Sequence, residues 1–228
     1  MHTVLRALLP QSCHLCAAPA GDALLCAACA TSLPALAMPR YPCCALPTLG
    51  GSLCGACLRR APAFDATVAA FVYAFPVDEL IQSLKYRGRL ALAEWAADAL
   101  CASLTAQSSP DLLLAMPLSR ARQRERGYNQ ALEIARLVAR QTRVPLLPSA
   151  VTRIKDAPPQ ATLPWKERAK NIRGAFACAH DLHGKTVAVV DDVMTTGASL
   201  DELACTLKRA GAARVENWIV ARTLPPGG

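Results

Sequence analysis

The sequence predicts an α/β protein in which a mostly parallel sheet is flanked by helices and preceded by a small cysteine-rich module. Eight of the eleven cysteines lie within residues 13–57, and short apolar segments alternate with amphipathic ones after residue 62. Such alternation is typical of parallel sheets covered by helices. Of the 228 residues, 53% are hydrophobic, which excludes disorder for most of the chain. We place a domain boundary at residue 62, which gives domains 1–62 and 63–228.

The cysteine-rich segment predicts a metal site. The pairs Cys13/Cys16 and Cys26/Cys29 both have CxxC spacing, with nine residues between them. Clustered cysteines in a cytoplasmic protein favour metal binding over disulfides. A CxxC turn directs two thiolates at one ion, and a second turn completes the tetrahedral sulfur cage that zinc favours. We therefore expect structural Zn²⁺ at these four cysteines.

The motif recurs further along the chain at one constant offset, which indicates a tandem repeat. In this second copy the matching cysteines are Cys44, Cys54 and Cys57. The copy is imperfect, because Tyr41 stands where the first copy has Cys13, and a tyrosine does not replace a thiolate at a structural zinc site. Cys43 is the alternative fourth ligand, so a second zinc is left open. The module either holds a small fold together or docks onto nucleic acid or protein.

The first half of the second domain alternates strands and helices. Residues 68–75 are apolar and rich in aromatic and β-branched side chains, which predicts a strand. Residues 77–86 carry Leu80, Ile81 and Leu84 on one helical face. The next predicted elements are an alanine- and leucine-rich helix at 90–106, a short buried strand at 111–116 and a helix at 129–141.

The second half begins with an irregular segment, residues 150–178, whose three prolines indicate a hairpin or a mobile flap. Residues 186–190 form the clearest buried strand, residues 199–210 the clearest following helix, and residues 213–222 a last strand. Ligands of such sheets bind at the carboxyl ends of the strands. The residues that follow position 190 are therefore the first place to expect a site.

Polar side chains follow the strand predicted at 186–190. The acidic pair Asp191 and Asp192 comes first, and a loop follows that consists of Thr195, Thr196, Gly197, Ala198 and Ser199. Hydroxyls and loop amides donate to a phosphate, and the helix N-terminus adds partial positive charge. Paired carboxylates beside a phosphate suit two neighbouring hydroxyls, such as those of a ribose. A simple helix cap is the alternative, but a cap requires neither both aspartates nor three hydroxyls.

This stretch resembles the 5-phosphoribosyl-1-pyrophosphate (PRPP) signature of type I phosphoribosyltransferases. The resemblance implies a type I phosphoribosyltransferase-like sheet, with Asp191 and Asp192 on the ribose hydroxyls and residues 195–199 on the 5′-phosphate. It also implies Mg²⁺ bound together with PRPP. In these transferases the loop after the strand predicted at 111–116 binds pyrophosphate, so that role is expected for Pro117, Leu118 and Ser119.

A second resemblance covers nearly the whole chain. Residues 116–119 and the sequence Arg126-Gly127-Tyr128-Asn129-Gln130 resemble the "RGFNQ" region of the ComF family, which joins an N-terminal zinc module to a phosphoribosyltransferase domain. Further family-like positions are Leu84-Lys85-Tyr86-Arg87-Gly88, Gln160, Arg168, Asn171 and Ala175-Phe176. Tyr41 departs from the family, which usually has a cysteine there. That departure concerns the second zinc and leaves the PRPP site intact.

Four arginines follow the strand predicted at 111–116, with only Glu125 opposing them: Arg120, Arg122, Arg124 and Arg126. Arginine forks suit pyrophosphate or the backbone of single-stranded DNA. The alternative is that these arginines lie on a solvated loop and bind no ligand. The net charge of +8 fits polyanion binding without specifying the polyanion.

The resemblances imply two functions. The first is transfer of a phosphoribosyl group from PRPP to an unidentified acceptor, with release of pyrophosphate, linked to natural competence and DNA uptake. The second is non-catalytic binding of single-stranded DNA or of competence and recombination proteins, with PRPP as ligand or regulator. The longest apolar run, residues 68–75, is too short to span a membrane, and residues 1–12 do not read as a signal peptide. We therefore expect a cytoplasmic protein.

Overall fold

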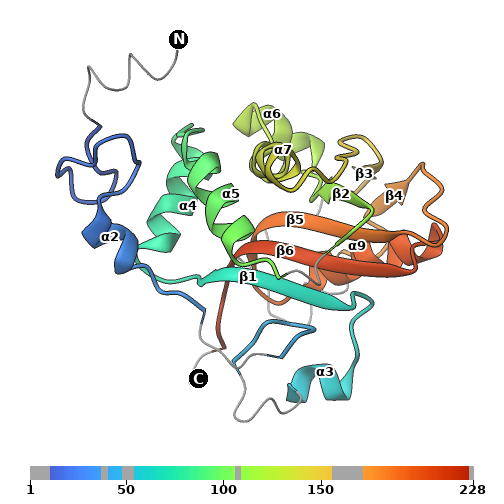
Figure 1. The fold of residues 1–228 in the computed structure, drawn as a ribbon. Helices are drawn as coiled ribbons and strands as arrows, with labels where there is room; N and C mark the ends of the chain where they lie inside the picture. Colours follow the sequence, from blue (N-terminus) through green and yellow to red (C-terminus); the bar gives the residue numbers. More distant parts are fainter. Residues whose placement is uncertain (1–10, 37–40, 48–53, 106–108, 156–171, 226–228) are drawn as a thin grey trace.

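The computed structural model describes residues 11–36, 41–47, 54–105, 109–155 and 172–225. In these residues a four-stranded sheet is formed by β1 (Ala66–Val72), β2 (Leu112–Ala115), β5 (Thr186–Met194) and β6 (Arg214–Arg222). The strand order is β1-β6-β5-β2 and every neighbouring pair is parallel (Figure 1). The predicted parallel sheet is confirmed.

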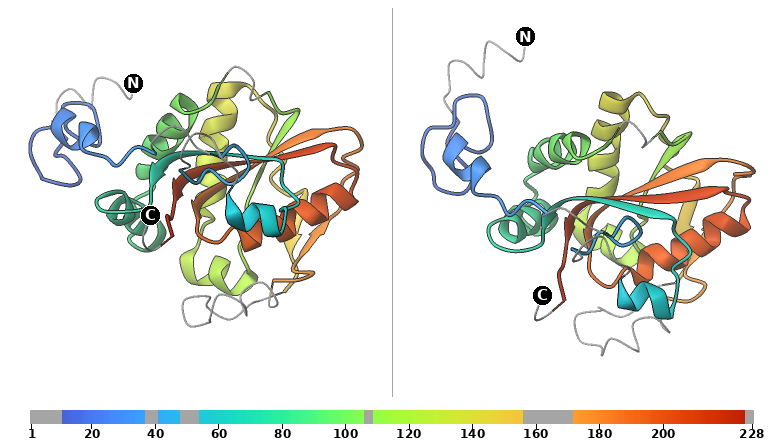
Figure 2. Two further views of the ribbon diagram at one scale, coloured as in Figure 1. Left: turned by 90° about the horizontal axis from the view of Figure 1, so that it is seen from below. Right: turned by 60° about the horizontal axis from the view of Figure 1, so that its bottom comes forward.

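Helices cover both faces of the sheet, as Figures 1 and 2 show. One face carries α4 (Val77–Tyr86), α5 (Leu92–Ala102) and α7 (Gln130–Thr142), whose apolar stripes pack on Ala188, Val190 and Trp218. The other face carries α9 (Ala198–Arg209), which packs on Val187, Val189 and Ile219. Successive side chains of a strand point to opposite faces, so most positions of β5 and β6 are buried, including the polar residues Asp192, Glu216 and Asn217.

The segment predicted as a hairpin or flap contains a small antiparallel pair. Strand β3 (Val151–Arg153) pairs with β4 (Phe176–Cys178), which confirms the hairpin. The family-like positions Gln160, Arg168 and Asn171 lie outside the described residues.

The structure corrects the predicted ends of two strands and shows a helix where none was predicted. β1 ends at Val72 instead of residue 75, because its partner β6 ends at Arg222, and Phe75 is exposed. β5 continues past residue 190 to Met194, because β6 offers it partners as far as Arg222. The arginines at 120–126 form a helix, α6 (Arg120–Arg126), rather than a loop. Ser119 caps its start and Gly127, in the left-handed conformation, ends it.

The cysteine repeat is visible in the backbone. Helix α2 (Ala27–Thr31) begins directly after Cys26, and helix α3 (Gly55–Arg59) begins directly after the matching Cys54. The Ala17 amide donates to the Cys13 carbonyl at 2.9 Å, and the Ala45 amide donates to the Tyr41 carbonyl at 2.8 Å. Ala17 and Ala45 have matching positive φ values of 61° and 56°. The two copies therefore share one knuckle fold although their sequences differ at the first ligand position.

The two copies pack on different parts of the core. Cys13 and Leu25 of the first copy join the apolar cluster of α4 and α5, whereas Cys44 and Ala45 of the second join the cluster of α9. The chain between the copies runs along β1, where Val72 donates to the Pro34 carbonyl at 2.8 Å. This segment covers the edge of β1. The division of the chain at residue 62 stays a prediction.

Within the part of the chain that the structure describes, no helix combines the length and the apolar character that crossing a bilayer requires. The cytoplasmic location stays a prediction.

Candidate functional site

The acidic pair lies inside strand β5 rather than after it. Asp192 is buried, and its Oδ2 lies 3.0 Å from Nζ of Lys85, near the end of α4. Asp191 is partly buried, and its Oδ1 accepts a hydrogen bond from the Asp192 amide at 2.9 Å. The structure thus brings together two carboxylates and one ammonium group at the carboxyl-terminal part of the strand.

The charges of this cluster are strongly coupled. Burial raises the pKa of Asp191 to about 8; the neighbouring Asp192 carboxylate adds to this rise and Lys85 opposes it. Burial by itself would lower the pKa of Lys85, but the Asp192 and Asp191 carboxylates outweigh it and raise that pKa. Two carboxylates facing one ammonium leave excess negative potential. A cation or a set of hydroxyl donors relieves it.

The loop after β5 leads into the N-terminus of α9. Thr195 is exposed, and the Thr196 hydroxyl oxygen accepts from the Ala198 amide at 3.1 Å. Gly197 has φ +80°, and a Cβ built on it would lie 2.6 Å from Cε of Met194. Glycine is favoured there by its conformation, and a Cβ would also require the Met194 methyl group to shift. Ser199 stands in the first turn of α9, where the helix dipole favours an anion.

A buried arginine that the sequence analysis missed holds the backbone of this loop through hydrogen bonds. Arg222 ends β6 and is 5% exposed. Its Nη1 donates to the carbonyls of Met194, at 3.0 Å, and of Thr195. Its Nε donates to the Cys44 carbonyl at 2.9 Å. The only sequence signal was a charged residue directly after the apolar run from Trp218 to Ala221.

The loop expected to bind pyrophosphate follows β2, next to β5 in the sheet. The Met116 amide donates to the Val190 carbonyl at 2.9 Å, which places residues 117–119 at the same carboxyl edge as Asp191. Ser119 is buried and its Oγ accepts from the Arg122 amide at 3.4 Å. Beside this loop is a cleft of about 980 Å³. Its lining includes Pro117, Leu118, Arg120, Arg124, Thr152 and Ile154.

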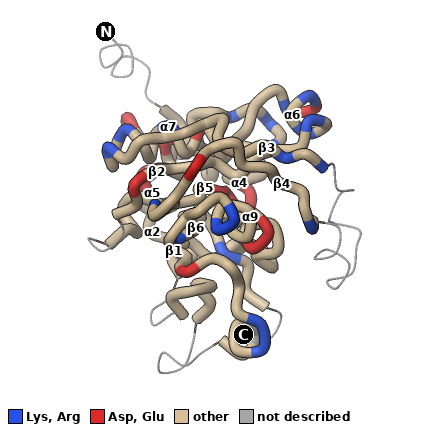
Figure 3. Tube along the Cα trace, turned by 90° about the vertical axis from the view of Figure 1, so that its right-hand side faces the viewer, with Lys and Arg blue, Asp and Glu red and all other residues tan. Residues whose placement is uncertain are grey.

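The four arginines divide into two groups. Arg120, Arg122 and Arg124 are exposed on α6, where Figure 3 shows the basic positions gathered. Arg126 is partly buried; it lies over the Tyr86 ring at 5.1 Å, and its Nη1 donates to Oε1 of Gln130. Arg126 thus connects α6 to α4 and α7, whereas the other three arginines face solvent.

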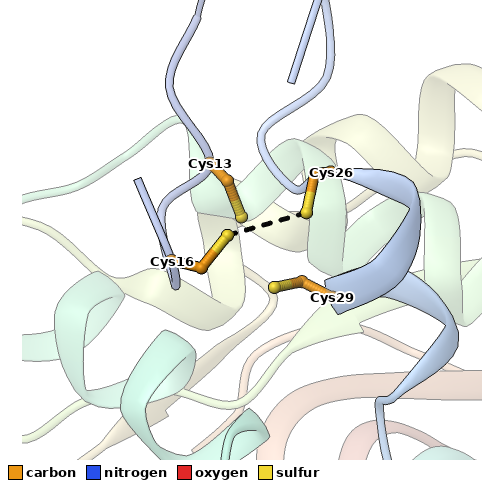
Figure 4. A group of neighbouring side chains, drawn as sticks. All are labelled: Cys13, Cys16, Cys26 and Cys29. Carbon is orange, nitrogen blue, oxygen red and sulfur yellow. Dashed lines mark hydrogen bonds between the residues drawn. The ribbon is translucent and has the colours of Figure 1, made fainter. Parts of the chain in front are cut away.

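The first cysteine copy forms a complete sulfur cage. The sulfur atoms of Cys13, Cys16, Cys26 and Cys29 lie within 4.8 Å of one another and converge, as Figure 4 shows. Burial raises the pKa of Cys13, but hydrogen bonds from the amides of Cys26, Cys16 and Leu15 outweigh it and lower the value to about 6. A thiolate favoured in this way suits tetrahedral zinc.

The second copy brings three sulfurs together. Those of Cys44, Cys54 and Cys57 lie within 4.8 Å of one another. The structure does not bring the sulfur of Cys43 into this group; it donates instead to the Phe64 carbonyl at 3.6 Å. Tyr41 occupies the knuckle position of Cys13. Three thiolates fit zinc when a further ligand completes its coordination.

Comparisons with known proteins agree with this architecture. Residues 4–58 match the double zinc ribbon domain family. The chain is 32% identical over 170 residues to Competence protein F of Haemophilus influenzae, which covers 71% of this chain and 74% of that protein. It is 32% identical over 171 residues to DNA utilization protein YhgH of Escherichia coli, covering 72% and 75%. It is 27% identical to Competence protein ComFC of Bacillus subtilis, covering 68% and 63%.

Solved structures give weaker matches. A glutamine PRPP amidotransferase from B. subtilis is 19% identical, with a TM-score of 0.39, over 56% of this chain and 26% of that one. A purine phosphoribosyltransferase from Pyrococcus horikoshii is 18% identical, with a TM-score of 0.32, over 70% and 88%. Scores of this size carry no argument about function.

The ribbon match and the two cysteine groups support structural zinc in the N-terminal module. The H. influenzae and E. coli relatives each align with more than two thirds of the chain, so the resemblance is not confined to the cysteine motifs. With its double-zinc-ribbon match and with relatives that are 32% identical over about three quarters of their own length, the chain belongs to the ComF family.

Proposed function

We propose that this protein binds PRPP and transfers its phosphoribosyl group to an acceptor, with release of pyrophosphate. The observation that carries the proposal is the sequence of groups along one strand and loop. Asp191 and Asp192 lie in the last half of the buried strand β5, and a glycine turn after Met194 then leads into the N-terminus of α9. This order offers acceptors for ribose hydroxyls and donors for a phosphate within one short segment.

Each group has a role in this proposal. The Asp191 carboxylate accepts from the ribose hydroxyls, while Asp192, held by Lys85, fixes the position of the pair. Thr195, Thr196 and the amides at the start of α9 bind the 5′-phosphate. The residues 117–119 face the pyrophosphate. The bond between C1 and the pyrophosphate oxygen breaks with its electron pair on the leaving group, and the acceptor then bonds to C1.

A divalent cation fits the charge of this site. Two carboxylates face one ammonium, and Asp191 offers the oxygen donor that Mg²⁺ prefers. Mg²⁺ supplies charge neutralisation for the leaving pyrophosphate when it is bound with PRPP. The contribution of the chain itself is to orient the substrate and to exclude alternative geometries.

The test is calorimetric titration of Mg²⁺-PRPP into the wild type, into Asp191→Asn and into the Asp191→Asn/Asp192→Asn double variant. Asp191→Asn keeps the ion pair between Lys85 and Asp192, so a loss of PRPP affinity in this variant does not come from breaking that pair. We expect both variants to lose at least about tenfold in affinity, because each loses a charged acceptor. Asp22→Asn, at an exposed carboxylate of the first cysteine copy, is the charge control. A wild type that does not bind Mg²⁺-PRPP would contradict the proposal.

A second candidate function is binding of single-stranded DNA or of a competence protein without catalysis. The observation that favours it is the cleft beside α6, where Arg120 and Arg124 stand next to the apolar Leu118 and the exposed Ile154. Cations along the backbone and apolar groups under the bases are what single strands require. Replacing Arg120, Arg122 and Arg124 with alanine removes at most about three phosphate contacts. The plot of the logarithm of the DNA-binding constant against the logarithm of salt concentration should then be less steep, by the counterions those contacts release. An unchanged slope removes α6 from this hypothesis.

A further inference from the structure

Arg222 joins the second cysteine copy to the loop before α9. Its guanidinium donates to the Cys44 carbonyl on one side and to the Met194 and Thr195 carbonyls on the other. It also donates to the Thr223 carbonyl at 2.8 Å. All four acceptors are backbone carbonyls. One rigid, planar group therefore ties the backbone of a cysteine knuckle to the backbone of the expected phosphate loop.

The Arg222 guanidinium lies buried beside the second cysteine group, where it donates to the Cys44 carbonyl. Burial lowers the pKa of Arg222, and negative charge on Cys44, Cys54 and Cys57 opposes that effect. A buried cation is tolerated when opposite charge lies nearby. With a divalent ion bound, three thiolates would carry one net negative charge, which the Arg222 guanidinium would balance. A fourth thiolate, absent because Tyr41 stands at that position, would leave one negative charge unbalanced.

We propose that metal binding at Cys44, Cys54 and Cys57 positions the 5′-phosphate loop through Arg222, so that the affinity for PRPP depends on whether this site holds zinc. The inference rests on the proposed PRPP function. It makes Arg222 a positioning residue: its side chain donates to backbone carbonyls, among them those of Met194 and Thr195 at the loop, and it acts on the ligand through that loop. It also gives the two ribbon copies different tasks.

The route of the coupling is short. Cys44 is a ligand candidate, and the carbonyl of the same residue accepts from Arg222. A shift of the knuckle on losing its metal moves this carbonyl, and the guanidinium must then follow it or lose the hydrogen bond. The same guanidinium holds the Thr195 carbonyl, two residues before Gly197. The left-handed turn at Gly197 sets the direction of the first amides of α9. A shift of the Thr195 carbonyl would therefore change the positions of the amides that are proposed to bind the phosphate.

The repeat supplies a matched control for the experiment. Cys57 in the second copy and Cys29 in the first are equivalent positions, each the last cysteine of its copy. We would measure zinc per chain by elemental analysis and the dissociation constant of Mg²⁺-PRPP by calorimetry for Cys57→Ser and Cys29→Ser in the full-length chain. Each variant should lose about one zinc, but only Cys57→Ser should weaken PRPP binding, by about tenfold.

A second measurement avoids variants that fold poorly. Coupling is reciprocal, so Mg²⁺-PRPP should make one zinc of the wild type harder to remove by a chromophoric chelator, again by about tenfold. Arg222→Lys keeps a positive charge but lacks the planar fork, and in that variant PRPP should no longer protect the zinc. The other zinc, in the first copy, should leave at the same rate with and without PRPP.

The outcomes separate the two proposals. A wild type that binds Mg²⁺-PRPP while Cys57→Ser binds it equally well, or while Cys29→Ser weakens it as much, overturns the coupling and leaves the proposed function standing. No PRPP protection of zinc in the wild type also overturns the coupling. A wild type that does not bind Mg²⁺-PRPP at all overturns both.

Discussion

Nζ of Lys85 lies 3.0 Å from Oδ2 of Asp192, and this ion pair connects the end of α4 to the strand that carries the candidate ribose-binding carboxylates. Both side chains are largely shielded, with 18% of Lys85 and 5% of Asp192 exposed. The pair allows one of two adjacent carboxylates to stay charged inside the sheet. It also explains why a lysine in the Leu84–Gly88 segment matters to a site that lies far along the sequence.

Lys85→Met should lower the free energy of unfolding by about 3 kcal/mol, because it leaves the buried Asp192 carboxylate without its cation. The measurement is urea denaturation at neutral pH. Arg87→Met is the control, since the ion pair of Arg87 with Glu79 at 3.7 Å is exposed and should contribute less than about 1 kcal/mol. Equal losses in the two variants would show that the Lys85 pair has no special role.

Gly197→Ala should destabilise the protein and weaken binding of Mg²⁺-PRPP. The added Cβ meets Cε of Met194 at 2.6 Å, and the residue must keep φ at +80°. Gly184→Ala is a matched control, because Gly184 also has a positive φ, +71°, but no heavy atom within 4 Å of a built Cβ. It should therefore show only the conformational cost of about 1 kcal/mol. If thermal and urea unfolding give the same loss for both, crowding at Gly197 is unimportant.

The stability of the protein should depend on pH through Asp191. Burial raises the pKa of this carboxyl to about 8, whereas the unfolded chain ionises it near its ordinary value of 3.8. The folded state thus holds a proton that the unfolded state has lost between these values. The stabilisation from Asp191 is complete below pH 4 and is lost as the pH rises to about 8, with a slope of about 1.4 kcal/mol per pH unit.

Comparison of the wild type with Asp191→Asn by urea denaturation from pH 4 to pH 9 measures this contribution. The variant should lack that part of the slope, while other titrating groups contribute equally to both proteins. Parallel stability curves for the two proteins would place the pKa of Asp191 near its ordinary value.

Tyr41→Cys should convert the second cysteine group into a full quartet. Tyr41 has the knuckle geometry of Cys13, so a thiol there points at the same centre as its neighbours. We expect the variant to hold its second zinc at chelator concentrations that strip the wild type. Tyr41→Phe, which adds no thiol, should behave as the wild type does. Purified wild type should contain one to two zinc ions per chain, and visible absorbance from iron would contradict the zinc assignment.

The secondary structure could be predicted where a buried face requires apolar residues at a regular spacing along the sequence. Residues 186–190 and the helix after Gly197 were predicted because strand and helix positions that face a core must be apolar. Helix α6 could not be predicted in this way, since its seven residues, Arg120–Arg126, have no apolar stripe. The predicted end of β5 was wrong for a related reason: aspartates are uncommon in strands, and the strand continues because Asp191, Val193 and Met194 pair with β6.

The side chains of the candidate site could be proposed from the sequence, but the hydrogen bonds that hold its loop in place could not. The acidic pair and the hydroxyl loop are local patterns, whereas the hydrogen bond of Arg222 to Cys44 joins residues 178 positions apart through a carbonyl that every residue has. Whether Cys43 supplies the fourth ligand that is missing at Tyr41 was equally undecidable from the sequence. In the structure the sulfur of Cys44 lies with those of Cys54 and Cys57 and that of Cys43 does not, and Ala45, next along the chain, has a positive φ that no composition rule signals.

Strand β1 has consequences for the order in which the chain folds. It pairs with β6, whose residues are the most distant in sequence of any strand in the described sheet, and its other edge is covered by the chain between the two ribbon copies. Contacts of such long range form late. Metal binding folds a ribbon from residues close in sequence, independently of the sheet. A nascent chain would therefore bind its zinc before the sheet forms. The pairing of β1 with β6, which completes the sheet, would follow after the ribbons have folded.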